Sequence, residues 1–229
     1  AGASGPYVPT QAMAESARAE GRGVPGAQGS AGLAIPMILP PLILGSRSRP
    51  RRRLLEEAGV SFSVQVPEVD EKALGDRASG DAETLVRLLA TAKADALLPE
   101  LPPGSRLLLT SDQVVTYRGK IREKPENMDE ACAFVASYAT APCATVGALC
   151  LHDVPSGQRV TGVQVATIFF KPSIADEEVL LQLKKDDSLL QCAGGLMVEH
   201  PIVEKHVDRV EGGLDAVQGL SVPLLADLW

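Results

Sequence analysis

The sequence has few of the residues that metal sites and disulfide frameworks need. Its 229 residues include only 4 Cys and 3 His, and the cysteines form no C-x-x-C pair. A structural zinc site and a disulfide framework are therefore not expected. Cationic residues are also scarce, with 22 Lys and Arg against 29 Asp and Glu and a formal net charge of -7. That balance argues against bulk nucleic-acid binding but is compatible with a small anionic ligand.

Long apolar runs are missing as well. None approaches the roughly 20 residues that are needed to span a bilayer. We therefore expect a soluble protein from a reducing compartment, with neither a membrane nor nucleic acid as its partner. The length suits one large domain or two small ones.

Residues 1–40 differ from the rest of the chain. They are rich in Ala, Gly, Ser and Pro, with almost no large side chains. Such a segment cannot bury enough apolar area to offset its ordering entropy, so we expect a flexible extension before one domain over residues 41–229. Its small residues and scattered Arg also suit part of an organelle transit peptide, although Glu15 and Glu20 argue against that. A cytoplasmic location is expected, with a chloroplast or mitochondrion as the alternative.

From residue 41 onward, strand and helix patterns alternate. We expect strands over 42–44, 61–66, 107–110, 114–117, 144–151 and 158–170, and helices over 51–59, 81–98, 128–138, 176–185 and 224–229. In the second helix Asp81 is a candidate cap, and Leu85, Leu88, Leu89 and Ala92 are expected to share its apolar face. Strands that alternate with helices indicate an α/β layered domain, and the long strands after residue 144 indicate antiparallel pairing too.

The turn between the first strand and the first helix is rich in arginine. Gly45 to Arg53 reads GSRSRPRRR and contains five Arg in a chain that is acidic overall. Backbone amides at such a turn favour an anion, so a polyphosphate site is one interpretation, with serine hydroxyls and backbone donors around the phosphate oxygens and arginine side chains outside them. A solvated charge run is the other. Arginines at a helix N-terminus oppose the helix dipole, and this favours the anion site.

Asp112 follows the apolar run Leu107 to Leu109 and stands between Ser111 and Gln113. A carboxylate at the end of a buried strand lies where α/β enzymes place catalytic groups, and it suits a divalent metal or the deprotonation of water. A turn residue that accepts local amide hydrogens is an equally good interpretation.

Other candidates are weaker when each is taken alone. Lys124 is held in an extended segment by the proline that follows it, which suits a fixed cation, and Lys93 stands late in an apolar-faced helix. The acidic sequence PEVDE offers three candidate metal ligands, Glu68, Asp70 and Glu71. The segment CAGGLMVEH allows close backbone approach to a flat ligand, and Glu199 offers acceptors for a base edge. A Cys192–His200 nucleophile pair is a further interpretation, but no third residue is evident to orient it.

Taken in order, these segments resemble the Maf (septum-formation) family of nucleoside triphosphate pyrophosphatases. The resemblance covers about residues 42–229 and is carried by LILGSRSRPRRRLLEEAGVSF, PEVDE, the helix with Lys93, SDQVV, GKIREKP, CAGGLMVEH and VEGGLDAVQGL. It implies a Maf/inosine-triphosphatase-like α/β fold, with a long curved mixed β-sheet flanked by helices and a cleft between two lobes. It also implies cleavage of a nucleotide between its α and β phosphates with a divalent cation, Mg²⁺ or Mn²⁺.

The resemblance carries roles to particular residues. Asp112 matches the family's proposed general base, and Glu71 matches an acidic position linked to metal or water, so both are expected near the metal. The phosphate-side polar residues of the family are matched by Ser46, Arg51, Lys93 and Lys124.

Base preference is expected to follow the 7-methyl-GTP branch. The dTTP/UTP branch has Thr after the Asp and Gln in the later segment, where this chain has Gln113 and Glu199. A guanine offers N1–H and N2–H donors that a carboxylate accepts together, whereas uracil or thymine offers one ring donor, which an amide suits better. At the third specificity position, Pro50 departs from the Trp usual in that branch. Arg49 replaces the serine of the usual Ser-Pro order, and Ser221 stands in place of the proline in Gly-Leu-Pro.

The expected function is therefore house-cleaning hydrolysis of a modified or non-standard nucleotide, with 7-methyl-GTP as the substrate. A dTTP/UTP-type pyrophosphatase is one alternative. A nucleotide-binding regulator without catalysis is another, motivated by the altered Arg49-Pro50 turn. The third is an interaction module that docks through its Arg-rich stretch. A homodimer is compatible with the resemblance.

Overall fold

The structure is a computed structural model that describes residues 39–229. The predicted extension over residues 1–40 lies outside the described residues except for its last two positions. Within the described part, no helix combines the length and the apolar character that crossing a membrane requires.

Seven strands and seven α-helices make up the described domain. The strands are β1 Leu42–Gly45, β2 Phe62–Val64, β3 Leu107–Tyr117, β4 Lys120–Arg122, β5 Cys143–Asp153, β6 Gln158–Phe170 and β7 Val207–Glu211. The helices are α1 Arg49–Glu57, α2 Ala82–Leu97, α3 Met128–Ser137, α4 Glu177–Leu183, α5 Pro201–His206, α6 Leu214–Val217 and α7 Val222–Leu228. All strands join one mixed sheet in the order β2-β1-β3-β5-β6-β7, with β4 paired to β3. The predicted mixed α/β fold is confirmed.

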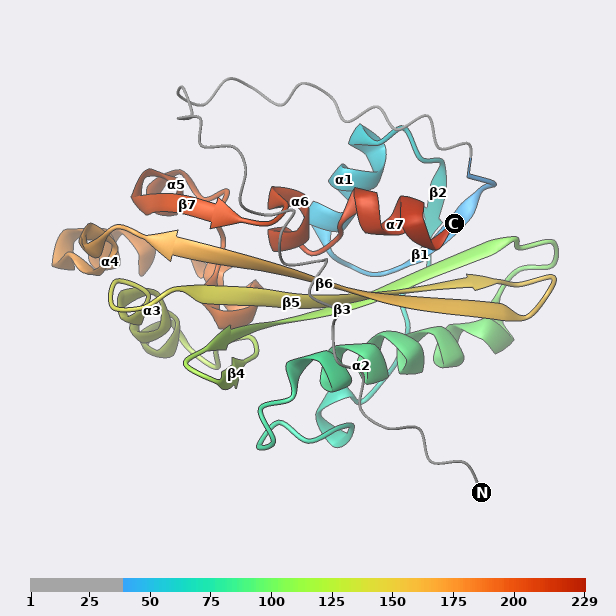
Figure 1. The fold of residues 1–229 in the computed structure, drawn as a ribbon, viewed down its shortest axis with the longest axis horizontal. Helices are drawn as coiled ribbons and strands as arrows, with labels where there is room; N and C mark the ends of the chain where they lie inside the picture. The colour runs from blue at the N-terminus through green and yellow to red at the C-terminus, as the bar shows by residue number, and fades with distance from the viewer. Residues whose placement is uncertain (1–38) are drawn as a thin grey trace, which may run out of the picture. The chain divides into compact units, whose positions relative to one another are not determined.

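The first part of the sheet is parallel and carries helices on both faces. β1 lies parallel to β2 and to β3, with Gly45 opposite Thr110. Helix α1 connects β1 to β2, and α2 connects β2 to β3. The two helices lie on opposite faces of the sheet (Figure 1). The turn after β1 is thereby placed beside the middle of β3.

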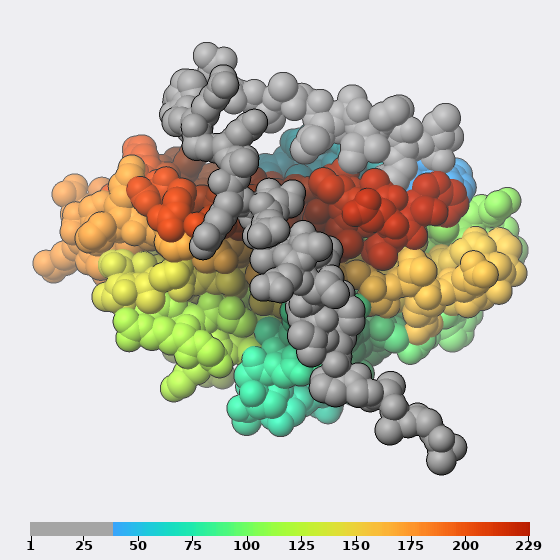
Figure 2. All heavy atoms as spheres, in the orientation of Figure 1, coloured from blue at the N-terminus to red at the C-terminus, as the bar shows by residue number. Residues whose placement is uncertain are grey.

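The rest of the sheet is antiparallel, as the sequence predicts. β5 pairs with β3 on one side and with β6 on the other over almost its whole length. β7 adds to the far half of β6. Helices α6 and α7 pack on β6, and Figure 2 shows the C-terminal residues against this strand.

Apolar side chains form three clusters that leave the centre of β3 polar. One cluster lies between α2 and the sheet, a second joins α1 and α7 to the opposite face, and the third gathers α3, α4 and α5 around the far ends of the long strands. Between them, Thr110, Ser111 and Asp112 are buried without belonging to any cluster. The centre of β3 therefore carries three consecutive buried polar residues that are candidates for the functional site.

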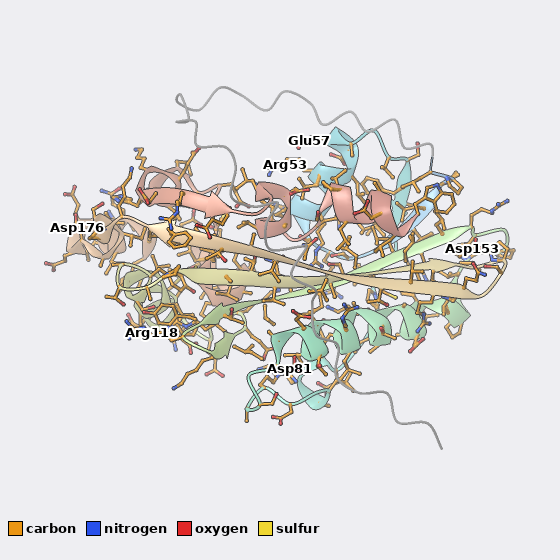
Figure 3. The ribbon with its side chains drawn as sticks, in the orientation of Figure 1. Arg53, Glu57, Asp81, Arg118, Asp153 and Asp176 are labelled. Carbon is orange, nitrogen blue, oxygen red and sulfur yellow. The ribbon has the colours of Figure 1, made fainter. Side chains whose placement is uncertain are left out.

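Helix α2 begins as predicted but turns a different face inward. The Asp81 carboxylate accepts a hydrogen bond from the Thr84 amide and caps the helix. Figure 3 shows Asp81 on the opposite side of the sheet from Arg53 and Glu57 of α1. The prediction that Leu88 faces the core is wrong, since it is 40% exposed. The buried positions follow helical spacing from Ala82 to Leu97 and include Lys93.

The strand at Asp112 is also longer than predicted. The sequence predicts two strands on either side of residues 111–113, but β3 is continuous from Leu107 to Tyr117. Asp112 therefore lies within a strand rather than in a turn at its end. Polar residues normally interrupt a buried strand, but here partners from other elements satisfy each of them.

Several helix starts differ from expectation by one or two residues. Helix α1 begins at Arg49, where Ser48 is the cap and Pro50 occupies the first turn, a position that needs no backbone N–H donor. Helix α4 begins after Asp176, one residue later than predicted, and the preceding residues Pro172–Ala175 form a separate 3₁₀ turn.

Candidate active site

Asp112 and Lys93 form a buried ion pair on the α2 face of the sheet. Side chains alternate along β3, so Thr110, Asp112 and Val114 point toward α2. The Lys93 Nζ lies 2.5 Å from Asp112 Oδ1 and 3.0 Å from Glu71 Oε1. The Lys93 and Asp112 side chains are only 10% and 9% exposed, whereas that of Glu71 is 46% exposed. One ammonium thus joins two carboxylates, one of which is open to solvent.

The environment of Asp112 favours its neutral form more than water does. Burial raises the pKa of the Asp112 carboxyl above its ordinary value, and the charges of Lys93 and Arg51 oppose that shift only in part. The carboxylate of Glu71 adds to it. A carboxyl with a raised pKa accepts a proton more readily, which suits a general base.

Arg51 ties the turn after β1 to β3 and to the C-terminal segment. Its Nη1 donates to the Ser46 hydroxyl at 3.2 Å and to the Ser111 carbonyl at 3.0 Å, while its Nε donates to the Gly219 carbonyl at 2.9 Å. Burial lowers the pKa of Arg51, and Asp112 and Glu71 oppose the shift, so the guanidinium stays charged. A fixed cation therefore lies beside Ser46 and within electrostatic reach of Asp112.

Gln113 lies on the other face of β3. Its Nε2 donates to the Val217 carbonyl at 2.9 Å. Gly219 has φ +105°, and a Cβ there would come within 2.9 Å of Gln113 Oε1 and 3.1 Å of Arg51 Nε. Only glycine allows this close approach. Gln113 is thus adjacent to Arg51 but points away from Asp112.

The Gly-rich segment lies against the segment that carries Lys124. The Gly194 amide donates to the Glu123 carbonyl at 2.8 Å. Burial raises the pKa of the Cys192 thiol to about 11, with Glu199 adding to the shift and Lys124 opposing it, so both charges lie near this cysteine. The Cys192 thiol donates to the Ser188 carbonyl, and His200 bonds Asp186 at 3.1 Å. The Cys192–His200 nucleophile hypothesis is therefore wrong, because each residue is engaged elsewhere.

A sequence model of one known family, described as Maf-like protein, matches residues 41–229. The chain belongs to the Maf family. It is 34% identical to a 7-methyl-GTP pyrophosphatase of Dictyostelium discoideum over 82% of this chain and 95% of that protein. It is also 34% identical to a nucleoside triphosphate pyrophosphatase of Synechococcus sp. (strain JA-2-3B'a(2-13)), over 82% of this chain and 92% of that protein. A dTTP/UTP pyrophosphatase of Treponema denticola is 29% identical over 82% of this chain and 94% of that protein.

The fold of this Maf chain brings most of the sequence candidates together, though not all of them. Asp112, Lys93 and Glu71 are in contact, and Ser46 with Arg51 lies on the neighbouring turn. Lys124 is exposed, and within residues 39–229 it has no ion-pair partner. Across the same residues, no hydrogen bond joins Glu199 to Gln113. Pro50 lies in the first turn of α1, so its role at the base stays a prediction.

Two carboxylates are the candidate metal ligands. Among the described residues, no group of three or more His, Cys, Asp or Glu side chains gathers at one point. Mg²⁺ in phosphate chemistry is commonly held by one or two carboxylates together with substrate phosphates and water. Glu71 and Asp112, which converge on Lys93, fit this donor set.

Arg77 lies next to Glu71 and Glu123 in the candidate site, and it is not identified from the sequence. Its guanidinium lies between the loop that follows Glu71 and the carboxylate of Glu123. A lone arginine in a polar loop gives no sequence signal, because its partner stands 46 residues away.

Proposed function

We propose that the chain is a nucleoside triphosphate pyrophosphatase that acts on a modified or non-standard nucleotide, with 7-methyl-GTP as its expected substrate. The observation that supports this most is the buried Asp112, with a raised pKa, in contact with Lys93 and beside Glu71. In a Maf-family chain whose relatives carry pyrophosphatase names, that arrangement suits activation of water for attack on phosphorus.

Each residue has a part in the proposed reaction. Arg51 and the Ser46 turn bind the triphosphate, and Lys124 neutralises charge on its outer phosphates. Asp112 orients a water molecule and accepts its proton as the oxygen bonds to the α phosphorus. The bond from that phosphorus to the bridging oxygen then breaks, and pyrophosphate leaves. Glu71 and Asp112 would hold a divalent cation, which supplies charge stabilisation to the phosphate oxygens when bound.

The proposal is tested by assaying pyrophosphate release from a panel of nucleotides. The panel contains ATP, GTP, CTP, UTP, dTTP and 7-methyl-GTP, each with Mg²⁺ and with Mn²⁺. We expect the highest kcat/KM for 7-methyl-GTP, with monophosphate and pyrophosphate formed in equal amounts. A preference for UTP and dTTP would place the chain with the other branch. Nucleotide binding without any pyrophosphate release would indicate the regulator instead.

Base recognition predicts a specificity change at Glu199. In Glu199→Gln the amide replaces one of two acceptor oxygens by a donor that faces the guanine N–H groups. We expect kcat/KM for 7-methyl-GTP to fall by about 10- to 100-fold relative to UTP, the range of a lost bidentate base contact. Glu204→Gln, an exposed change on α5, is the matched control. An unchanged ratio between the two substrates would contradict the role of Glu199.

A further inference from the structure

The Arg77 guanidinium uses its three nitrogens to bind the Glu123 carboxylate and the backbone carbonyls of the loop that carries Glu71. Its Nε and Nη2 donate to the two carboxylate oxygens of Glu123, at 2.9 and 3.1 Å. Nη2 also donates to the Glu71 carbonyl at 2.6 Å, and Nη1 donates to the Leu74 carbonyl. The Arg77 side chain is only 24% exposed. A paired, bidentate contact of this kind fixes geometry as well as charge.

The backbone of Glu123 contacts a second part of the molecule, the Gly-rich segment. Its carbonyl accepts the Gly194 amide at 2.8 Å, and the next residue is Lys124. Through Glu123, Arg77 is therefore connected to the Lys124 segment and to the Gly-rich segment that leads to Glu199. Three stretches far apart in the sequence meet at this one pair.

The loop that carries Glu71 packs on the rest of the fold through the partly buried Leu74, which lies against the apolar cluster between α2 and the sheet. Between β2 and α2 the chain forms only one short 3₁₀ turn, Glu71–Ala73, and none of its residues is buried. The contacts that join this loop to the rest of the site are Lys93 to the Glu71 carboxylate and Arg77 to Glu123. Partly exposed ion pairs add little to the free energy of unfolding. The Arg77–Glu123 pair therefore matters mainly because it fixes the position of the loop.

We propose that Arg77 and Glu123 form a positioning pair, which holds Glu71, Lys124 and the Gly-rich segment in one arrangement for metal and substrate. The proposal rests on the proposed function for its kinetic consequences, but its structural consequence stands without it. Arg77 acts through Glu71 and Lys124, and it does not itself touch the reacting atoms.

The test compares Arg77→Ala, Glu123→Gln and the double variant. We expect Arg77→Ala to raise the half-saturating Mn²⁺ concentration by about 10- to 100-fold, as loss of an outer-shell partner does. The substrate KM should rise as well, with kcat changed less. Glu123→Gln should act in the same direction but less strongly, because Arg77 keeps its bonds to the loop carbonyls. The double variant should have the same half-saturating Mn²⁺ concentration and KM as Arg77→Ala.

The matched controls are Arg106→Ala and Glu126→Gln. Both change exposed positions whose side chains have no partner in the described part of the chain.

A second measurement needs neither metal nor substrate. Hydrogen exchange of the backbone amides should become faster in residues 71–77 and 193–195 of the Arg77→Ala protein, while exchange in α2 stays unchanged. If Arg77→Ala does not fold, Arg77→Lys retains the charge without the fork and should show the same changes, but smaller.

Three results would overturn the pair. Additive effects of the two single variants would show that the residues act separately. A loss confined to Arg77→Ala, with Glu123→Gln like wild type, would show that Glu123 takes no part in positioning the site. Unchanged amide exchange would show that the loop is held without it. A wild-type protein that releases no pyrophosphate would instead refute the proposed function and leave the exchange result intact.

Discussion

Replacing Asp112 with asparagine (Asp112→Asn) is expected to lower kcat for nucleotide hydrolysis by about 10²- to 10⁴-fold, the contribution of a positioned general base. Asparagine keeps the shape and one acceptor oxygen, so the side chain can still receive the Lys93 hydrogen bond. It cannot take a proton from water. The measurement is pyrophosphate release at saturating Mg²⁺ or Mn²⁺.

The same substitution should leave the fold intact or stabilise it. A carboxyl whose folded pKa is raised has its full stability below the unfolded value of about 3.8, and loses stability as the pH rises through the folded pKa. At neutral pH the ionised Asp112 therefore costs stability, and asparagine removes that cost while Lys93 keeps its ion pair with Glu71. We expect the Tm at pH 7 to be equal to or above that of wild type.

The pH profile separates a general base from a residue that only binds. Wild-type kcat should fall on the acidic side as Asp112 becomes protonated, at a pH above the ordinary range of an aspartate. The residual activity of Asp112→Asn should lack that limb. Asp227→Asn, at an exposed position in α7, is the matched control. Near-normal turnover in Asp112→Asn would remove Asp112 from the catalytic role.

Local signals in the sequence located most elements of the fold. The apolar run of β1, the Asp81 cap and the long strands β5 and β6 each depend on neighbours in the chain, and the structure confirms each of them. The strand break predicted around residues 111–113 is wrong because the strand there depends on partners that are distant in the sequence. Its polar side chains are satisfied by Lys93, Val217 and Gly219, whose positions the sequence does not reveal.

Lys93 shows how a signal can be present in the sequence and still be outweighed. It falls at helical spacing with other members of the buried face of α2, namely Leu85, Val86, Leu89, Ala90 and Ala94. Because Leu88 is apolar, the sequence predicts a buried face that includes position 88 and leaves Lys93 outside it. A lysine at a core position is unusual and points to a buried partner, which the structure identifies as Asp112.

Lys93→Met is the second substitution with a large expected effect, this time on stability. Methionine fills a similar volume but leaves the buried Asp112 carboxylate without its nearest cation. Breaking a buried pair in this way costs about 3 kcal/mol, the lower end of the usual range, because Arg51 still acts on Asp112. In a domain of this size that corresponds to a fall in Tm of about 10 °C at pH 7. Thermal unfolding followed by circular dichroism measures it.

The double variant Lys93→Met/Asp112→Asn tests the cause. With both charges of the Lys93–Asp112 pair removed, most of the lost stability should return, although activity should not. The deficit of the single variant should also shrink as the pH is lowered from 7, because the raised pKa of Asp112 lets the carboxyl take up a proton above the usual range of an aspartate. Lys185→Met, at an exposed position, should leave the Tm unchanged. A double variant as unstable as Lys93→Met would mean that Lys93 stabilises the fold through packing of its stem, and that its charge serves Glu71 or the substrate rather than Asp112.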